Sequence, residues 1–157
     1  MNLFYPEHIM VLDALLRYQV RFLLIGGYAV IAYGYTRTTG DLDLWIDPSN
    51  QNKVALIDSF KYLKFDDSEL EILNQMDFNE ATVFSMGTIP QKIDFLTKVS
   101  HVDFNDAYTK VVLMEFDDLQ LPFVHYNDLV LMKMTTGRLK DKADIEELQK
   151  IQQHKKQ

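Results

Sequence analysis

The pattern of apolar and polar positions in the first part of the chain predicts a helix, a strand and a second helix. After Pro6, apolar residues recur at the spacing of an amphipathic helix, at Ile9, Leu12, Leu15 and Leu16. Residues 21–25 form a short apolar run, as in a buried strand, and a pair of glycines ends it. Helical spacing resumes over residues 28–33, and Gly34 is expected to end that helix.

Residues 41–46 alternate carboxylates with apolar side chains and then become wholly apolar. This pattern predicts a strand whose first residues face water and whose remainder is buried. Residues 47–49 are expected to end the strand and to cap a helix over 51–63. A weaker helix is predicted over 68–76.

The second half of the chain predicts more strands, followed by helices. Two strands are expected around Gly87 and Pro90, and a hairpin follows them, so that the four strands cover 82–85, 91–96, 110–116 and 119–124.

Asn127 or Asp128 is expected to cap a helix over 129–136, and Asp141 to cap a final helix. Together these elements predict an α/β or α+β fold in which a central mixed sheet is flanked by helices and a helix pair ends the chain. A length of 157 residues suits a single domain over 1–157.

The composition is that of an ordinary globular protein, with 47% hydrophobic and 25% charged residues. There are no cysteines, which excludes disulfides, thiolate metal sites and cysteine nucleophiles and suits a cytoplasmic location. The first residues lack the features of a signal peptide, and no apolar stretch reaches the length of a bilayer span, so no membrane segment is expected.

The formal net charge of −7 should repel nucleic acid backbones, and no run rich in lysine or arginine offsets it. A long duplex partner is therefore disfavoured. A small molecule, a protein or a local RNA end stays open as the partner, and so does a homodimer or a partner protein that helps to enclose a substrate.

The carboxylates of Asp41 and Asp43 are the main candidates for chemistry. Side chains two apart on a strand point to the same face, with Cα atoms roughly 6.5–7 Å apart. Such a pair can converge on two metal ions, which stand about 3.5–4 Å apart in phosphoryl-transfer sites. Asp94, on a later strand between apolar neighbours, is the best third ligand. The ligands are all hard oxygens, which favours Mg²⁺.

Asp94 would also lie near the metal closest to an attacking hydroxyl, where it could accept the proton. Gly26 and Gly27 would let the backbone approach a triphosphate closely, and the amides at the start of the next helix would face its charge. Metal ligands and a phosphate cradle in this order argue for transfer of a nucleotide.

These residues resemble the polymerase-β-like nucleotidyltransferase superfamily, in which a strand, Gly-Gly or Gly-Ser, a helix, a loop, Asp-x-Asp and a later Asp follow one another. The chain is most similar to small prokaryotic members, which include antibiotic adenylyltransferases and the nucleotidyltransferase toxins of abortive-infection and toxin–antitoxin systems. Residues 24–30 and 38–44 look like the Gly-Gly branch, and 131–145 is similar to its C-terminal helix pair. The resemblance implies the nucleotidyltransferase fold.

The resemblance also implies roles for the motif residues. Asp41 and Asp43 would bind both metals, and Asp94 would bind one and assist the nucleophile. Gly26 and Gly27 would contact the phosphates of a nucleoside triphosphate. Many members carry serine where this chain has Gly27, so the details of the triphosphate contact differ here.

Further phosphate contacts are expected from the loop before the metal strand and from the helix pair. Arg37 and Thr39 would supply the first, and Lys133 would bring a charge to the triphosphate with Arg138 and Lys140 behind it. The bland alternatives are a surface ion pair for Arg37 and a solvated lysine at 133.

The leading hypothesis is Mg²⁺-dependent transfer of a nucleoside monophosphate to an acceptor hydroxyl, with release of pyrophosphate. The alternative is a catalytically silent nucleotide-binding or protein-interaction module of a two-component system. A phosphatase of the haloacid-dehalogenase type is disfavoured, because there the apolar strand precedes the aspartates. His8, His101 and His154 lie in no motif and are expected at the surface.

Overall fold

A computed structural model describes residues 2–156, and these residues contain one mixed β-sheet and seven helices. The strands, in chain order, are β1 (Phe22–Ile25), β2 (Leu42–Ile46), β3 (Val83–Met86), β4 (Ile93–Leu96), β5 (Val112–Phe116) and β6 (Leu119–Phe123). The helices are α1 (Pro6–Arg17), α2 (Gly26–Ala32), α3 (Asn50–Tyr62), α4 (Asp67–Gln75), α5 (Phe104–Tyr108), α6 (Tyr126–Met134) and α7 (Leu139–Lys155). The predicted α/β class with a flanked mixed sheet is confirmed.

The order of strands in the sheet is β3-β4-β2-β1-β6-β5. At its centre β1 runs antiparallel to β2, whereas β2 and β4 are parallel. The C-terminal end of β1 and the N-terminal ends of β2 and β4 therefore meet at one edge of the sheet. This topology brings the glycine pair and the acidic strand ends to the same place.

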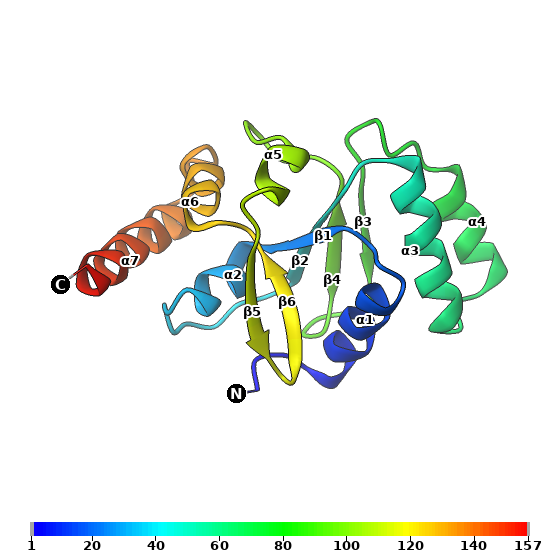
Figure 1. Ribbon diagram of the computed structural model, residues 1–157, viewed down its shortest axis with the longest axis horizontal. Helices are drawn as coiled ribbons and strands as arrows, with labels where there is room; N and C mark the ends of the chain where they lie inside the picture. Colours follow the sequence, from blue (N-terminus) through cyan, green and yellow to red (C-terminus); the bar gives the residue numbers. More distant parts are fainter. Residues whose placement is uncertain (1, 157) are drawn as a thin grey trace.

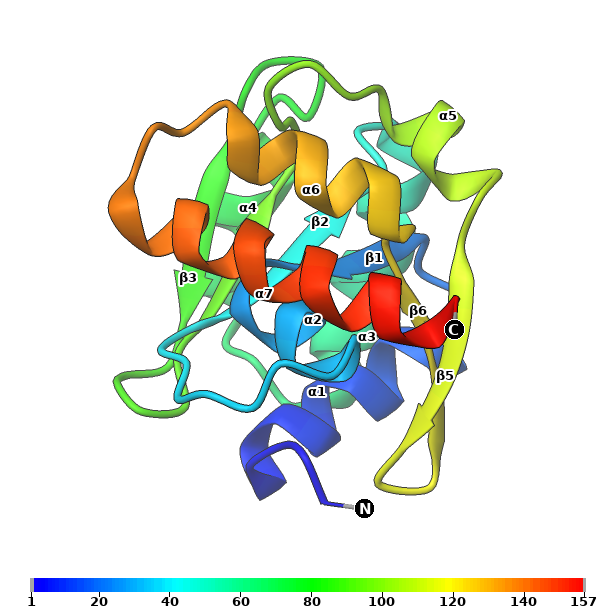
Figure 2. The same cartoon turned by 90° about the vertical axis from the view of Figure 1, so that its left-hand side faces the viewer.

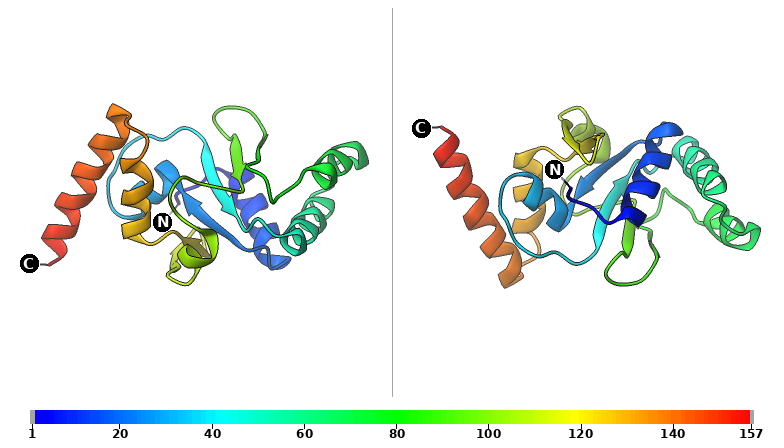
Figure 3. Two further views of the ribbon diagram at one scale, coloured as in Figure 1. Left: turned by 90° about the horizontal axis from the view of Figure 1, so that it is seen from above. Right: turned by 90° about the horizontal axis from the view of Figure 1, so that it is seen from below.

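Helices cover the sheet on two sides (Figure 1, Figure 3). One group contains α1, α3 and α4, which contact one another in sequence, and the other contains α2, α6 and α7. In Figure 2, α6 and α7 lie in front of the central strands. Alternation along β2 and β4 places Leu44 and Phe95 on the side of α3, where Phe60 packs edge-on against Phe95. Asp43 and Asp94 consequently face the side of α6 and α7.

Helix α1 has the apolar stripe that its sequence predicts, with one difference. His8 is fully buried within this stripe, although we expected it at the surface. Its Nε2 lies 3.1 Å from the carbonyl of Gln91, and the rings of Phe4, Tyr5 and Tyr28 surround it. Burial lowers the pKa of His8, so the neutral imidazole is favoured in this aromatic cluster.

The caps of the last two helices differ from the prediction. His125 rather than Asn127 or Asp128 is the N-cap of α6, because its Nδ1 accepts a hydrogen bond from the amide of Asn127 at 3.1 Å. Helix α7 begins at Leu139, before Asp141. Asp141 therefore lies in the first turn of the helix, and its carboxylate is free to bind other side chains.

Two smaller differences concern short helices. Helix α2 begins at Gly26 itself, two residues before the predicted start. Helix α5 was not predicted from the sequence, and its N-cap is Asp103, whose carboxylate accepts a hydrogen bond from the amide of Asp106. Phe104 of this helix packs edge-on against Trp45 on β2. Within residues 2–156, no helix combines the length and apolarity that a membrane crossing requires.

Candidate active site

The three aspartates and the two glycines line one cavity at the edge of the sheet. Asp43 on β2 and Asp94 on β4 are direct register partners on adjacent parallel strands. Asp41 lies one residue before β2, and the glycines lie where β1 ends and α2 begins. The cavity has a volume of about 380 Å³, and its lining is Gly26, Gly27, Arg37, Thr39, Gly40, Asp41, Asp43, Asp94, Lys133, Arg138, Lys140 and Asp141.

Gly26 is required at this position by its backbone and by its neighbour. Its φ is +69°, in the left-handed region that L-residues with a side chain rarely adopt. A Cβ on this residue would also collide with the carboxylate of Asp43. Only glycine lets the strand turn into α2 while the Asp43 carboxylate lies against the backbone.

The carboxylate of Asp43 is largely buried and lies near two other acidic side chains. Burial, together with the negative charges of Asp94 and Asp41, raises the pKa of Asp43 to about 6. Lys133 and Arg138 oppose this shift and do not cancel it. A cation bound between these carboxylates would supply the missing positive charge.

The carboxylates of Asp41 and Asp94 are already bridged by a lysine that sequence analysis missed. Nζ of Lys92 lies 3.3 Å from Oδ2 of Asp41 and 3.4 Å from Oδ1 of Asp94. Lys92 precedes Asp94 by two residues, so the alternation of a strand would have placed both on the same face. That spacing was the signal in the sequence.

Asp94 is also held by a neighbour on the edge strand. Ser85 is its register partner across β3 and β4, and the Ser85 hydroxyl donates a hydrogen bond to Oδ1 of Asp94. Sequence analysis did not single out Ser85, because only the strand register brings the two residues together. The bond fixes the direction of the Asp94 carboxylate.

The space beside Gly27 is filled by the loop that precedes β2. A Cβ on Gly27 would collide with the hydroxyl of Thr39 and would lie 3.3 Å from a terminal nitrogen of Arg37. A serine at position 27, as in many proteins of the resembling family, would therefore displace Thr39. In this chain the side-chain hydroxyl beside the glycine pair comes from Thr39.

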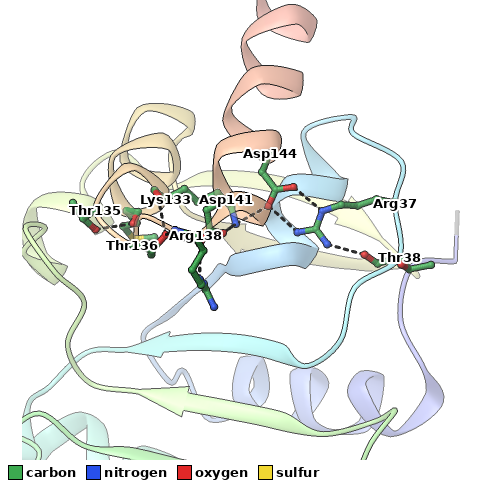
Figure 4. Close-up of polar contacts among 9 residues, drawn as sticks. Arg37, Thr38, Lys133, Thr135, Thr136, Arg138, Asp141 and Asp144 are labelled. Atoms are coloured by element: carbon green, nitrogen blue, oxygen red, sulfur yellow. Dashed lines mark hydrogen bonds and ion pairs between the residues drawn. The ribbon is translucent and has the colours of Figure 1, made fainter.

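A network of buried charges connects this loop to the helix pair (Figure 4). Arg37 donates two hydrogen bonds to Asp144 on α7, from Nε at 2.8 Å and from a terminal nitrogen at 2.9 Å. Lys133 on α6 lies 3.0 Å from Asp141 and 2.9 Å from Asp144. Lys133 is among the residues that line the cavity, and its ammonium is shared between two carboxylates.

Asp141 is the second anchor of this network. Burial alone would raise the pKa of Asp141, but hydrogen bonds from Thr136, Lys133 and Arg138 outweigh it and lower the value to about 2. Figure 4 shows these side chains converging between the two helices. Asp141 and Asp144 are spaced three apart on α7, which places both on the side of the helix that faces Lys133.

The donor set fits a hard divalent cation. Asp41, Asp43 and Asp94 offer only carboxylate oxygens, and the pKa of Asp43 is raised by burial and by the neighbouring negative charges, which such a cation would neutralise. Within residues 2–156 no three acidic or histidine side chains are yet close enough together to hold a metal. The three aspartates line one cavity, and their carboxylates would have to come closer together to share a metal ion.

Two solved structures share this fold. The lincosamide antibiotic adenylyltransferase LnuA, solved with lincomycin bound, superposes with a TM-score of 0.56 at 16% sequence identity, and the match covers 96% of this chain and 99% of LnuA. TM1012 of Thermotoga maritima, provisionally described as a nucleotidyltransferase, has a TM-score of 0.56 at 13% identity, with 93% and 94% of the two chains covered. At these identities the likeness shows the fold alone, and no curated protein matches the sequence.

A sequence family supplies the remaining comparison. Residues 7–154, nearly the whole chain, match the family described as "Nucleotidyltransferase of unknown function (DUF6036)". The match includes the glycine pair, the Asp-x-Asp strand, Asp94 and the helix pair. This family match confirms the resemblance to small prokaryotic nucleotidyltransferases, and the chain belongs to this nucleotidyltransferase family.

Proposed function

We propose that the protein transfers a nucleoside monophosphate from a nucleoside triphosphate to an acceptor hydroxyl, with the help of Mg²⁺. The observation that carries this proposal is the register pairing of Asp43 with Asp94, beside a glycine at which any Cβ would collide with the Asp43 carboxylate. This arrangement puts the three aspartates and the glycine pair in the lining of one cavity. Family membership supports nucleotidyl transfer as the general chemistry.

The reaction forms one bond and breaks one bond. The acceptor oxygen attacks the α-phosphorus, and the bond from that phosphorus to the oxygen bridging to the β-phosphorus breaks. Pyrophosphate leaves with the electron pair of the broken bond. The proton of the attacking hydroxyl passes to Asp94, whose carboxylate is directed by the hydrogen bond from Ser85.

Two Mg²⁺ ions held by Asp41, Asp43 and Asp94 would neutralise phosphate charge and lower the pKa of the acceptor hydroxyl. The protein itself binds and orients the triphosphate. Gly26, Gly27 and Thr39 line the cavity, and we expect the two glycine amides and the Thr39 hydroxyl to contact the phosphates.

Cations cover the other side of the triphosphate in this proposal. Lys133 and Arg37 are bound to carboxylates, so we expect them to act through their field and by holding the loop in place. Arg138 and Lys140 are exposed and line the cavity, and although Nε of Arg138 pairs with Asp141 at 2.7 Å, we expect both side chains to reach the β- and γ-phosphates. Such preorganised donors stabilise charge on the leaving pyrophosphate.

Two measurements test the proposal. The first is isothermal titration with each nucleoside triphosphate, with Mg²⁺ and with a chelator. The second is incubation with each α-³²P-labelled triphosphate and a cell extract, fractionated into RNA, protein and small molecules. We expect metal-dependent binding and transfer of label to one fraction, and neither with Asp43→Ala.

The control variant is Glu147→Gln, a residue of α7 that is outside the cavity lining, and it should transfer label like the wild type. Triphosphate binding without transfer to any fraction would favour the catalytically silent module. Absence of metal-dependent binding with all four triphosphates would refute the proposed enzyme.

A further inference from the structure

Lys92 holds a place that the proposed function leaves unexplained. Its ammonium contacts two of the three carboxylates that would bind metal, at 3.3 Å from Asp41 and 3.4 Å from Asp94. No part of the nucleotidyl-transfer scheme above requires a lysine between these ligands. The side chain is one-third exposed (33%), so it can rotate into solvent without opening a void in the core.

The position of Lys92 is set by the backbone of the site. The amide of Leu42 donates a hydrogen bond to the carbonyl of Lys92 at 3.0 Å, which ties the residue to the start of β2 beside Asp41. Lys92 also precedes Asp94 by two residues, so the two side chains point to the same face of the sheet. The side chain is thus anchored between the two carboxylates by the strand pairing itself.

We propose that Lys92 is an internal counter-cation of the metal-ligating carboxylates, and that a divalent metal must displace its ammonium to bind. This inference rests on the proposed function, because it takes Asp41, Asp43 and Asp94 as the metal ligands. In the metal-free protein the ammonium offsets part of the repulsion between carboxylates on β2 and β4. When metal binds, the lysine loses both ion pairs and moves to solvent.

The metal-free protein has the Lys92 ammonium at the carboxylate oxygens of Asp41 and Asp94, and the metal-bound protein has the metal at the same oxygens. The ammonium and the metal cannot both lie at contact distance from Asp41 and Asp94 without strong repulsion. Each partly exposed ion pair is weak, so the lysine weakens metal binding without preventing it. Removing the lysine should tighten divalent binding roughly three- to tenfold, the equivalent of two weak ion pairs.

The test measures metal binding directly, without turnover. Mn²⁺ is titrated into the full chain without nucleotide, with free Mn²⁺ followed by electron paramagnetic resonance. Lys92→Met and Lys92→Gln should bind Mn²⁺ about three- to tenfold more tightly than the wild type, and Lys92→Arg should not. Lys98→Met is the matched control, since Lys98 is exposed on the same chain segment and forms no ion pair with these carboxylates.

Thermal unfolding supplies a second readout. Without metal, Lys92→Met should melt below the wild type, and saturating Mn²⁺ should raise its Tm more than that of the wild type, because ligand binding stabilises in proportion to affinity. If the wild type binds Mn²⁺ and both neutral variants bind it equally or more weakly, the inference is wrong while the proposed function stands. If no variant with intact aspartates binds Mn²⁺, the metal site and the inference fail together.

Discussion

Substitution of Asp144 by asparagine is the sharpest test of how the C-terminal helix supports the site. Asp144 is 2% exposed in its side chain and binds Arg37 through both carboxylate oxygens, and Oδ2 also lies 2.9 Å from Lys133. Asparagine keeps the size of the side chain and removes its charge. The change therefore removes the negative charge that the buried side chains of Arg37 and Lys133 share.

The expected loss of stability follows from the burial of Arg37 and Lys133, the two partners of Asp144. Arg37 is 13% exposed and Lys133 is 9% exposed, so little water can replace the lost carboxylate. Removing one partner from a buried ion pair costs about 3–5 kcal/mol. We expect about 3 kcal/mol, at the lower end, because Lys133 keeps Asp141 and Arg37 keeps its hydrogen bond to the carbonyl of Thr38.

The measurement is equilibrium unfolding in urea, with the midpoint and slope compared between variant and wild type. For a domain of this length, a loss of 3 kcal/mol lowers Tm by about 6–12 °C. Glu147→Gln is the matched control on the same helix, since its pair with Lys150 at 3.3 Å is exposed. The control should lose less than about 1 kcal/mol.

A double-mutant cycle separates the Arg37 pair from other effects of the substitution. Arg37→Met alone should also destabilise, because it leaves Asp144 with Lys133 only. The double variant should then be more stable than the sum of the two single losses predicts. A loss for Asp144→Asn that matches Glu147→Gln, or full additivity in the cycle, would refute the view that this buried pair holds the loop.

Three further predictions concern the cavity itself. Gly26→Ala should cost about 2 kcal/mol more than Gly137→Ala in urea unfolding, because both have positive φ but only Gly26 has the Asp43 carboxylate where the methyl group would go. The pKa of Asp43 is about 6 in the folded state, which is above its value in the unfolded chain. Without metal, the folded state therefore binds more protons, and the free energy of unfolding falls as pH rises from about 4 to 6. Asp43→Asn should therefore gain about 2–3 kcal/mol at pH 8 and nothing near pH 3.5, and equal gains at both pH values would contradict this. Asp94→Asn should lower kcat for label transfer by roughly 10²–10⁴ while triphosphate affinity, measured by titration, changes less.

The acidic strand illustrates what local pattern can predict. Carboxylates alternating with apolar residues over 41–46 have one satisfactory solution, a strand with its acidic face toward water and its other face in the core. The observed β2 has Leu42 and Leu44 fully buried and Asp43 facing the cavity. The strand, the turn at Gly26 and the flanked mixed sheet were accordingly predictable from short stretches of sequence.

Pairing between distant segments was not predictable in this way. Sequence analysis selected Asp94 as the third carboxylate, but its direct pairing with Asp43 depends on β2 and β4 lying side by side in one particular register, across more than forty residues of intervening chain. Ser85 enters the site only through the further pairing of β3 with β4. The sequence pattern indicates which face of the sheet each side chain is on, whereas the strand register decides which side chains lie next to one another.

Buried charge was the other feature that local pattern hid. We expected Asp141 as a helix cap, because a carboxylate near a predicted helix start usually serves that purpose. In the structure Asp141 and Asp144 are both buried, and both bind cations from other elements. Nothing in the spacing of Arg37 and Lys133 indicates that their partners lie on the last helix.

These buried pairs give the helix pair a specific part in the geometry of the site. Arg37 contacts Asp144 through one end of its guanidinium and the Thr38 carbonyl through another, so α7 determines where residues 37–39 lie. The hydroxyl of Thr39 in that loop fills the space beside Gly27. A shift of α7 would therefore reach the glycine pair through two contacts, although α7 lies outside the sheet that carries the aspartates. Loss of the Arg37–Asp144 pair should for this reason weaken triphosphate binding in protein that is still fully folded, well below its Tm.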